Sequence, residues 1–294
     1  MAGIKKEIWL PVIENNFYSE WEILKRLAKD DSVYSDGTTL RIPNAGNLSA
    51  VAIDNTTYPV THEERTDTIK SIDMKSYQMK PVRIGKYDSV SLTYDKALSV
   101  SFDFAGNLGE VVKYDAFKGW YDVDMEKVVT TGANTDFGIG NRKKIKVADV
   151  RNCAKKLDEQ VVPDSGRILL LPSQMFYDLH ESIMADYDIV NIDGLEMLNR
   201  TFLGFEVVKQ PKVASIETSG LTINDWDHVP TSGDTILGYA YQKDQVSFSK
   251  GDYKFYSSEN RPEFYGDLVS AETWSLGTFR RNDKKGVVPI YMGF

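Results

Sequence analysis

The residues best suited to metal chemistry gather in the segment NDWDHVPTSGD (224–234). This short stretch holds three carboxylates and an imidazole, on Asp225, Asp227, Asp234 and His228. Hard cations prefer carboxylate oxygens, but the spacing matches no calcium-binding loop. Polar residues of a surface turn explain the segment equally well. A metal-dependent hydrolase using Asp225, Asp227 and His228 is the alternative from a different functional class, and no metal or cofactor is predicted.

Nucleophilic catalysis has little support in the sequence. The single cysteine, Cys153, lies on the apolar face of a predicted helix, which is typical of a small buried hydrophobic residue. No G-x-S-x-G elbow is present, and His180 has no second histidine four residues away. The sequence therefore predicts a protein that is not an enzyme.

A basic cluster follows two glycines in the segment FGIGNRKKIK (137–146). Its cations are Arg142, Lys143, Lys144 and Lys146. Glycines and lysines can cradle phosphate, but no strand precedes this loop and the Walker spacing is absent. A solvated loop is one interpretation, and local contact with a nucleic-acid backbone is the other.

Composition limits the possible partners. Lys and Arg number 35 and Asp and Glu 43, which gives a net charge of −8. An acidic chain does not coat nucleic acid over its whole surface. Hydrophobic residues make up 41% and charged residues 27%, as in a globular protein. No apolar run approaches the ~18 residues of a membrane span, so no membrane partner is predicted.

An aromatic segment opens the chain, over about residues 1–45. Its large apolar residues recur at helix-like spacing and include Trp9, Phe17 and Trp21. So much aromatic surface has to be buried, either on the same domain or on a neighbouring subunit.

The charged segment 61–84 predicts a two-stranded hairpin with too few apolar residues for a core of its own. An isolated hairpin is marginal in water, so this one is either a mobile loop or lies on another chain. The charged residues expected to dock on a neighbour are Glu63, Glu64, Arg65, Lys70, Lys75, Lys80 and Arg83.

The rest of the chain predicts an α+β protein. Residues 87–104 indicate a strand with a connector, and Asn107 with Glu110 resembles the start of a long helix that ends before Gly132. Residues 146–211 indicate helix, strand, helix and strand, with Ser173 as the N-cap of the second helix. From residue 236 the pattern is mostly short strands, namely ILGYAYQ, VSFS, YKFYSS, ETWSLGTFRR and GVVPIYM.

The order of these parts resembles the major capsid proteins of tailed bacteriophages, which have the Hong Kong 97-type fold. The stretch RILLLPSQMFYDLHE (167–181) is similar to a strand, proline and short helix of that family. LGFEVVKQP (203–211) is similar to its glycine followed by a strand that ends in proline. The resemblance covers essentially the whole chain, and it depends on the order of the motifs rather than on any one of them.

The resemblance implies a division of the chain into five parts. These are an N-terminal arm (1–45), an extended loop that reaches over an adjacent subunit (46–86), a peripheral domain with a spine helix (87–145, helix at 107–131), an axial domain (146–235), and C-terminal strands that return to both domains (236–294).

The resemblance also implies the function and the partners. The chain would assemble with itself into pentamers and hexamers of an icosahedral shell around double-stranded DNA, in the host cytoplasm, and end in the virion. A scaffolding protein, a portal and a decoration protein are the further expected partners, and Arg142, Lys143, Lys144 and Lys146 would face the DNA. An encapsulin-like nanocompartment shell is the alternative within the same fold.

Overall fold

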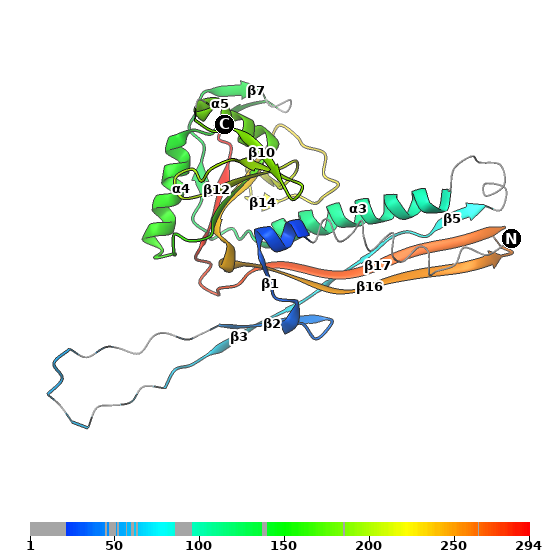
Figure 1. Ribbon diagram of the computed structural model, residues 1–294, viewed down its shortest axis with the longest axis horizontal. Helices are drawn as coiled ribbons and strands as arrows, with labels where there is room; N and C mark the ends of the chain where they lie inside the picture. The colour runs from blue at the N-terminus through cyan, green and yellow to red at the C-terminus, as the bar shows by residue number, and fades with distance from the viewer. Residues whose placement is uncertain are drawn as a thin grey trace.

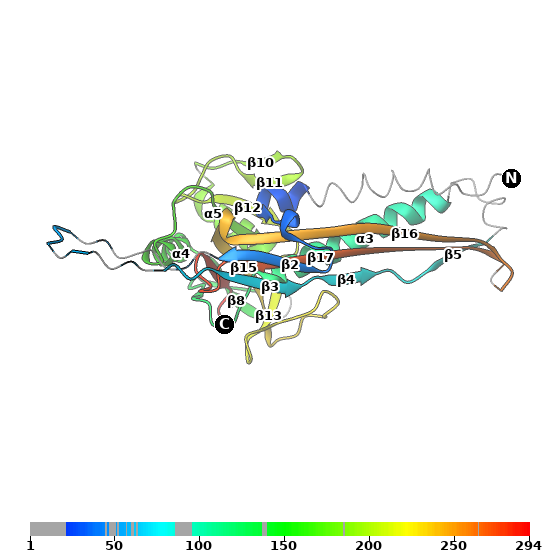
Figure 2. The same ribbon diagram turned by 90° about the horizontal axis from the view of Figure 1, so that it is seen from below.

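The computed structural model describes residues 22–44, 46, 51, 53–56, 58–59, 62, 64–85, 96–136, 140–184, 186–263 and 265–294. Three parts are visible in Figure 1: a body built on a curved sheet, a long arm of strands with a helix beside it, and a hairpin that projects from their junction. Seen at a right angle in Figure 2, the hairpin and the long arm point in opposite directions.

The body is a nine-stranded sheet among the described residues, with the order β10-β11-β12-β9-β15-β13-β14, with β18 paired to β15 and with β6 paired to β18. At its centre β9 (Arg167–Pro172) is buried at all six positions, because neighbouring strands and helices cover it. It runs parallel to β12 (Glu206–Gln210) and antiparallel to β15 (Asp234–Gln242). The other strands are β6 (Val128–Val129), β10 (Ile189–Ile192), β11 (Leu195–Leu198), β13 (Ala214–Glu217), β14 (Thr222–Ile223) and β18 (Val287–Tyr291).

Two helices pack on this sheet through one apolar cluster. In α4 (Val147–Glu159) the buried side chains Val150, Cys153 and Leu157 recur at helical spacing. With β9, α5 (Ser173–Ile183) and β12, this helix confirms the predicted order of helix, strand, helix and strand. The hairpin β10–β11 between them was not predicted, since Asp188, Asn191, Asp193 and Gly194 interrupt its apolar pattern.

The predicted N-cap of α5 is wrong. Pro172, the last residue of β9, occupies the N-cap position with φ −58°, and the structure has no side-chain cap there. Ser173 is already the first helical residue, because the chain turns directly from strand into helix.

The arm consists of two long strands rather than the predicted short ones. β16 (Val246–Arg261) and β17 (Gly266–Phe279) pair along their length, with a register shift between Lys250 and Tyr253. That irregularity surrounds Gly251 and Asp252, which divide the apolar pattern into two apparent strands. Three further strands complete this sheet, namely β1 (Lys29–Asp30), β4 (Lys75–Gln78) and β5 (Val82–Gly85).

The long helix α3 (Lys96–Gly119) lies along the arm, shifted from the predicted 107–131. Residues 96–104, expected in a strand and connector, are helical, and Asn107 is an exposed residue inside the helix rather than its start. The helix ends where Gly119 meets Gly277 of β17. A Cβ on Gly119 would lie 2.0 Å from the Gly277 carbonyl oxygen, so only glycine permits this contact.

The projecting hairpin pairs strands that the sequence analysis had separated. β2 (Thr39–Asn44) runs antiparallel to β3 (Thr68–Asp73), while β4 and β5 join the arm. The expected hairpin within 61–84 is therefore wrong. Met74, an apolar residue of that segment, packs instead with Leu40 and Ile42 of β2 and with Leu276 of β17.

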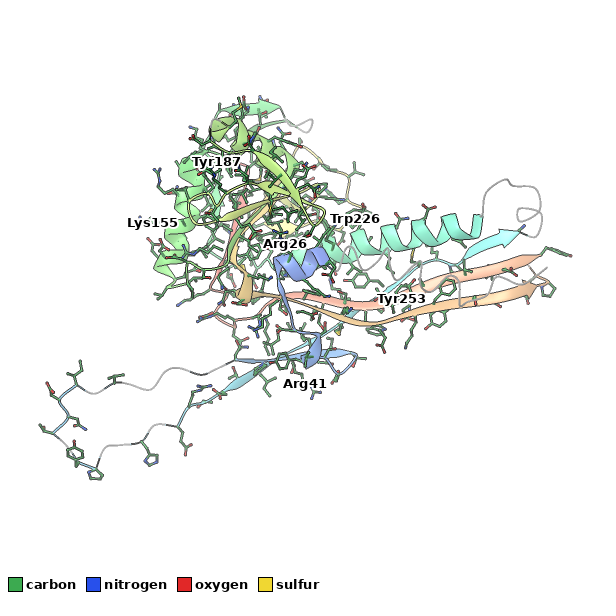
Figure 3. The ribbon with its side chains drawn as sticks, in the orientation of Figure 1. Arg26, Arg41, Lys155, Tyr187, Trp226 and Tyr253 are labelled. Carbon is green, nitrogen blue, oxygen red and sulfur yellow. The ribbon has the colours of Figure 1, made fainter. Side chains whose placement is uncertain are left out.

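Residues 22–31 tie the body to the arm. Leu24 and Leu27 of the helical segment 22–27 are buried in the main core. Arg26 forms ion pairs with Asp193 (3.2 Å) and with Glu206 (3.1 Å) of the body, and it is labelled in Figure 3. In the part of the chain that the structure describes, no helix is long and apolar enough to cross a membrane.

Candidate interaction surfaces

The loop beyond the β2–β3 stem carries exposed apolar side chains at a distance from the body. Val51 is 87% exposed, Ile53 85% and Tyr58 76%, and side chains of this loop are drawn in Figure 3. Burying a side chain of this size contributes a free energy of about 1.5–3 kcal/mol. Contact of this loop with the surface of another molecule would therefore be favourable.

The base of this loop is held by Asp67. Its Oδ1 accepts a hydrogen bond from the Gly46 N–H at 2.9 Å and one from Arg65 Nε at 2.6 Å. These donors lower the pKa of the Asp67 carboxyl, so it stays ionised at neutral pH. A Cβ on Gly46 would lie 2.2 Å from the Thr66 carbonyl oxygen, and glycine therefore lets the two sides of the loop approach closely.

The charged residues predicted to dock on a neighbour fall into three groups. Glu64, Lys80 and Arg83 are exposed, and Arg65 pairs with Asp67 inside its own loop. Lys75 forms an ion pair with Asp115 of α3 at 2.7 Å, and Lys70 donates to the end of β17. Sequence reasoning missed these contacts within the chain because it did not foresee that β3 and β4 lie against the arm. Trp9, Phe17, Trp21 and Glu63 lie outside the described residues.

One face of the arm is covered by α3, and among the described residues the other face is covered near the body. There the hairpin stem packs over Trp274 and Leu276. Farther out, Tyr256 is 51% exposed and its hydroxyl donates to Glu272, which also accepts from Gln78. Exposed Lys254 lies opposite Glu272 in the strand register. The sequence signal for this face was the alternation in YKFYSS.

The basic cluster does not form one surface. Arg142 is 3% exposed and donates to the carbonyl oxygens of Ser232 (2.8 Å) and Asp234 (2.7 Å), while its guanidinium stacks 3.9 Å from the Phe294 ring centre. These contacts offer no support for its predicted contact with DNA, because its donors are used and buried within the subunit.

The lysines of the same cluster differ in exposure. Lys144 forms an ion pair with Glu181 at 2.8 Å, and Lys143 is half-buried. Lys146 is exposed, and its backbone N–H donates to Asp149 at the start of α4. The assignment of these three lysines to DNA stays a prediction.

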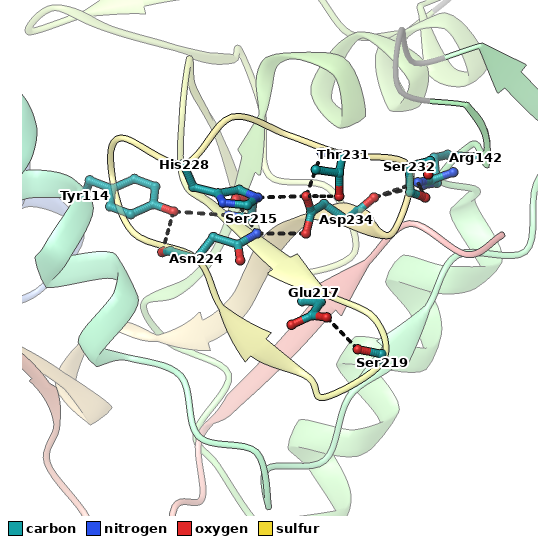
Figure 4. Close-up of polar contacts among 10 residues, drawn as sticks. All are labelled: Tyr114, Arg142, Ser215, Glu217, Ser219, Asn224, His228, Thr231, Ser232 and Asp234. Carbon is teal, nitrogen blue, oxygen red and sulfur yellow. Dashed lines mark hydrogen bonds and ion pairs between the residues drawn. The ribbon is translucent and has the colours of Figure 1, made fainter.

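The acidic segment 224–234 forms a polar network that fixes its own loop. Figure 4 shows that the Asp234 carboxylate accepts hydrogen bonds from Thr231, from Asn224 and from His228 Nε2, the last at 2.8 Å. Burial opposes ionisation, but these hydrogen bonds hold the pKa of the Asp234 carboxyl well below its usual range. The network thus connects Asn224, His228 and Thr231 to Asp234 across the loop.

The hydrolase residues do not converge. Asp225 pairs with Lys118 of α3 at 2.6 Å, whereas His228 faces Asp234. Among the described residues, no group of three His, Cys, Asp or Glu side chains is arranged to hold a metal ion. The described geometry therefore offers no support for the metal-dependent alternative.

Comparison with known proteins identifies the fold. No protein-family model and no curated protein matches the sequence. The head structure of Helicobacter pylori bacteriophage KHP40 matches with a TM-score of 0.61 and 13% identity, over 90% of this chain and 86% of that one. The capsid of Ralstonia phage GP4 also gives 0.61, with 9% identity, over 91% and 87%. A virus-like particle from Pyrococcus furiosus gives 0.52 at 9% identity, over 95% and 96%.

These likenesses extend over nearly the whole length of both partners in each comparison. The chain has the fold of tailed-phage capsid proteins, the Hong Kong 97-type fold, as the order of its sequence motifs predicted.

Proposed function

We propose that the chain is the major capsid protein of a tailed bacteriophage, which assembles into the pentamers and hexamers of an icosahedral shell around double-stranded DNA. The observation that carries this proposal is the agreement of fold over about nine-tenths of the chain with capsid subunits. A scaffolding protein, a portal and a decoration protein are the expected further partners. The proposed site of assembly is the host cytoplasm, and the mature location is the virion.

The shape of the subunit supports assembly through many modest contacts. A shell uses heterologous contacts that close by symmetry, and their strengths combine through multivalency. A projecting hairpin with an apolar tip extends the contact area without needing a large core of its own. The exposed side chains of Val51, Ile53 and Tyr58 are suited to this role.

Charge favours the outer face of a neighbouring arm as the seat of this loop. The described residues of the loop include acidic Asp54 and Glu64, and Arg65 is neutralised by Asp67. The face of the arm away from α3 offers Arg83 on β5, and it offers Lys254, whose charge is partly offset by Glu272 on the opposite strand. Opposite charges steer such surfaces together and fix their register.

Sedimentation velocity, with negative-stain images of any fast-sedimenting fraction, tests the proposed function. We expect the wild-type chain to form pentamers, hexamers or closed shells. The double variant Val51→Asp, Ile53→Asp should stay at the subunit mass of about 33 kDa, because it places two charges where apolar contacts form.

The control is Val161→Asp, which alters an equally exposed valine (89%) on the body. It should assemble like the wild type. Unchanged assembly of the loop variant would overturn the role of the loop, and a wild-type chain that never assembles, even together with the proposed scaffolding protein, would overturn the proposed function.

A second candidate is a nanocompartment shell that encloses proteins. The match to the virus-like particle from Pyrococcus furiosus supports this second candidate, since the match covers 96% of that chain. Nuclease-protected DNA inside particles isolated from the native source supports the phage capsid. A protein cargo without DNA supports the nanocompartment.

A further inference from the structure

The loop between β14 and β15 is held against α3 on its inner side. Lys118 of α3 pairs with Asp225 at 2.6 Å, and the ring of Tyr114 meets the ring of Trp226 edge-on at 5.5 Å. Lys212 Nζ donates to the Trp226 carbonyl oxygen at 2.5 Å and lies 3.9 Å from the centre of its indole ring. Because these contacts already position the loop, its docking on a partner would cost little conformational entropy.

Two side chains of the same loop are exposed and take no part in those contacts. Val229 is 78% exposed, and exposed Asp227 has no ion-pair partner among the described residues. Burial lowers the pKa of Lys212, and the carboxylates of Asp227 and of exposed Glu110 in α3 oppose this effect. The two carboxylates therefore lie near the same lysine, and the loop presents an acidic surface with one apolar side chain.

The opposite side of the body carries the complementary charge. Arg151 and Lys155 of α4 lie one helical turn apart at exposed positions, away from the side chains that pack on the sheet. In the part of the chain that the structure describes, Arg151 has no ion-pair partner, and Lys155 has Glu159 at the long distance of 3.8 Å. Figure 3 places Lys155 at one side of the body and Trp226 at the other.

The two projections lie on matching sides of the molecule. The β2–β3 hairpin and α4 are on one side, and the arm and the β14–β15 loop are on the other (Figure 1). A neighbour that receives the hairpin on its arm therefore turns its β14–β15 loop toward α4. Such a contact joins two different surfaces, so it can repeat around a ring and close by rotation.

We propose that the β14–β15 loop of one subunit docks on the outer face of α4 of the adjacent copy, with Asp227 opposite Arg151 and Lys155. This inference rests on the proposed function, since it needs copies arranged around a common axis. Opposite charges fix the register of the two surfaces. Val229 would lie against the aliphatic stems of the two cations.

A charge exchange tests this docking. Arg151→Glu and Asp227→Arg each place like charges face to face, so each should raise the concentration needed for assembly about tenfold in sedimentation velocity. The variant with both substitutions restores opposite charges in reversed order and should assemble like the wild type. The control combines Arg151→Glu with Asp103→Arg, which alters an exposed carboxylate of α3 outside the loop. It has the same net charge and should not recover.

Cross-linking of the wild-type assembly needs no variant. A carbodiimide joins a carboxylate to an amine as an amide and takes up the water that is lost. In assemblies mixed from isotope-labelled and unlabelled subunits, mass spectrometry should find Asp227 joined to Lys155 of another copy.

The outcomes separate this docking from the proposed function. Wild-type rings combined with single variants that assemble normally, with a double variant that does not recover, or with no such cross-link would overturn the docking and leave the capsid proposal unaffected. A wild-type chain that never assembles, even together with the proposed scaffolding protein, would overturn both.

Discussion

At the scale of single residues, Asp178 of α5 is a buried carboxylate with few groups to stabilise its charge. Its side chain is 6% exposed, and its Oδ2 has no hydrogen-bond partner among the described residues. Its Oδ1 accepts from Gln174 at 3.4 Å and lies 3.8 Å from Lys144 Nζ. Burial raises the pKa of this carboxyl, against the opposing effect of the lysine.

Replacing Asp178 should therefore stabilise the subunit. Asp178→Asn keeps the shape and removes the buried charge, and we expect a gain of about 1 kcal/mol in the free energy of unfolding at pH 7. A raised pKa means that the folded wild type binds its proton more readily than the unfolded chain, so the wild type loses stability as pH rises above about 4. The advantage of the variant should shrink on acidification.

Urea denaturation at pH 4 and pH 7 measures this difference. Glu181→Gln serves as the control, because Glu181 is exposed and its pKa is lowered by Lys144. That variant should gain no stability. An Asp178→Asn protein that is less stable than the wild type at pH 7 would show that the ionised carboxylate is favourable where it lies.

Cys153 provides a probe of unfolding at the same scale. Burial raises the pKa of its thiol to about 12, and the side chain is fully buried in α4, as the apolar face of the predicted helix indicated. A thiol reagent at pH 8 should leave the folded protein unmodified and react once urea unfolds it. Rapid labelling of the native subunit would contradict the packing of α4 on the sheet.

At the scale of elements, the crossing of α3 over β17 depends on two glycines. A Cβ on Gly119 would meet the Gly277 carbonyl oxygen, and a Cβ on Gly277 would lie 2.4 Å from the Cα of Ala116. The backbones of the helix and the strand are therefore in direct contact at this point. Trp120 donates to the Ser247 carbonyl oxygen from the residue after the helix.

Adding one methyl group at this crossing should destabilise the subunit. For Gly277→Ala we expect a loss of about 3 kcal/mol, because strand and helix have to separate. Gly106→Ala is the matched control in α3, since nothing lies within 4 Å of its Cβ, and it should gain about 0.5–1 kcal/mol of helix stability. Thermal unfolding of both variants measures the difference, and equal melting temperatures would contradict the close crossing.

Local periodicity predicted those elements whose burial is either continuous or regularly spaced along the chain. The run RILLLP, the apolar face of α4 and the order of α4, β9, α5 and β12 follow from patterns within a few residues. The pairing of β2 with β3 does not follow from any local pattern, because it brings Thr39 next to Asp73 across a long loop. The burial of Arg142 likewise depends on Asp234 and Phe294, far along the chain. Contacts of this kind leave no trace in local spacing, and they account for the residues assigned to the wrong surface.

At the scale of the whole molecule, the two projections extend from one junction. The arm and the hairpin both begin near the end of β17 and point away from each other (Figure 2). An elongated subunit of this form buries less of its surface alone than a rounded one of the same length. The exposed side chains of its loop, and those on the face of its arm away from α3, are accounted for if neighbouring copies cover them.

Shortening the loop should block assembly without unfolding the subunit. Replacing residues 46–66 by a two-residue Asn-Gly turn would keep the β2–β3 stem and the contact of Lys70 with β17. We expect circular dichroism and melting temperature close to those of the wild type, and no closed shells in negative-stain images. Shells of normal size from the shortened chain would show that assembly does not use the loop.

Electron cryomicroscopy of the assembled wild-type protein tests the central claim most directly. The account predicts rings of five and six copies in a closed shell, with the loop of each copy lying on the outer face of its neighbour's arm beside Tyr256 and Lys254. A closed shell in which the loop of each copy lies away from its neighbour's arm, or an assembly without rings of five and six copies, would contradict it.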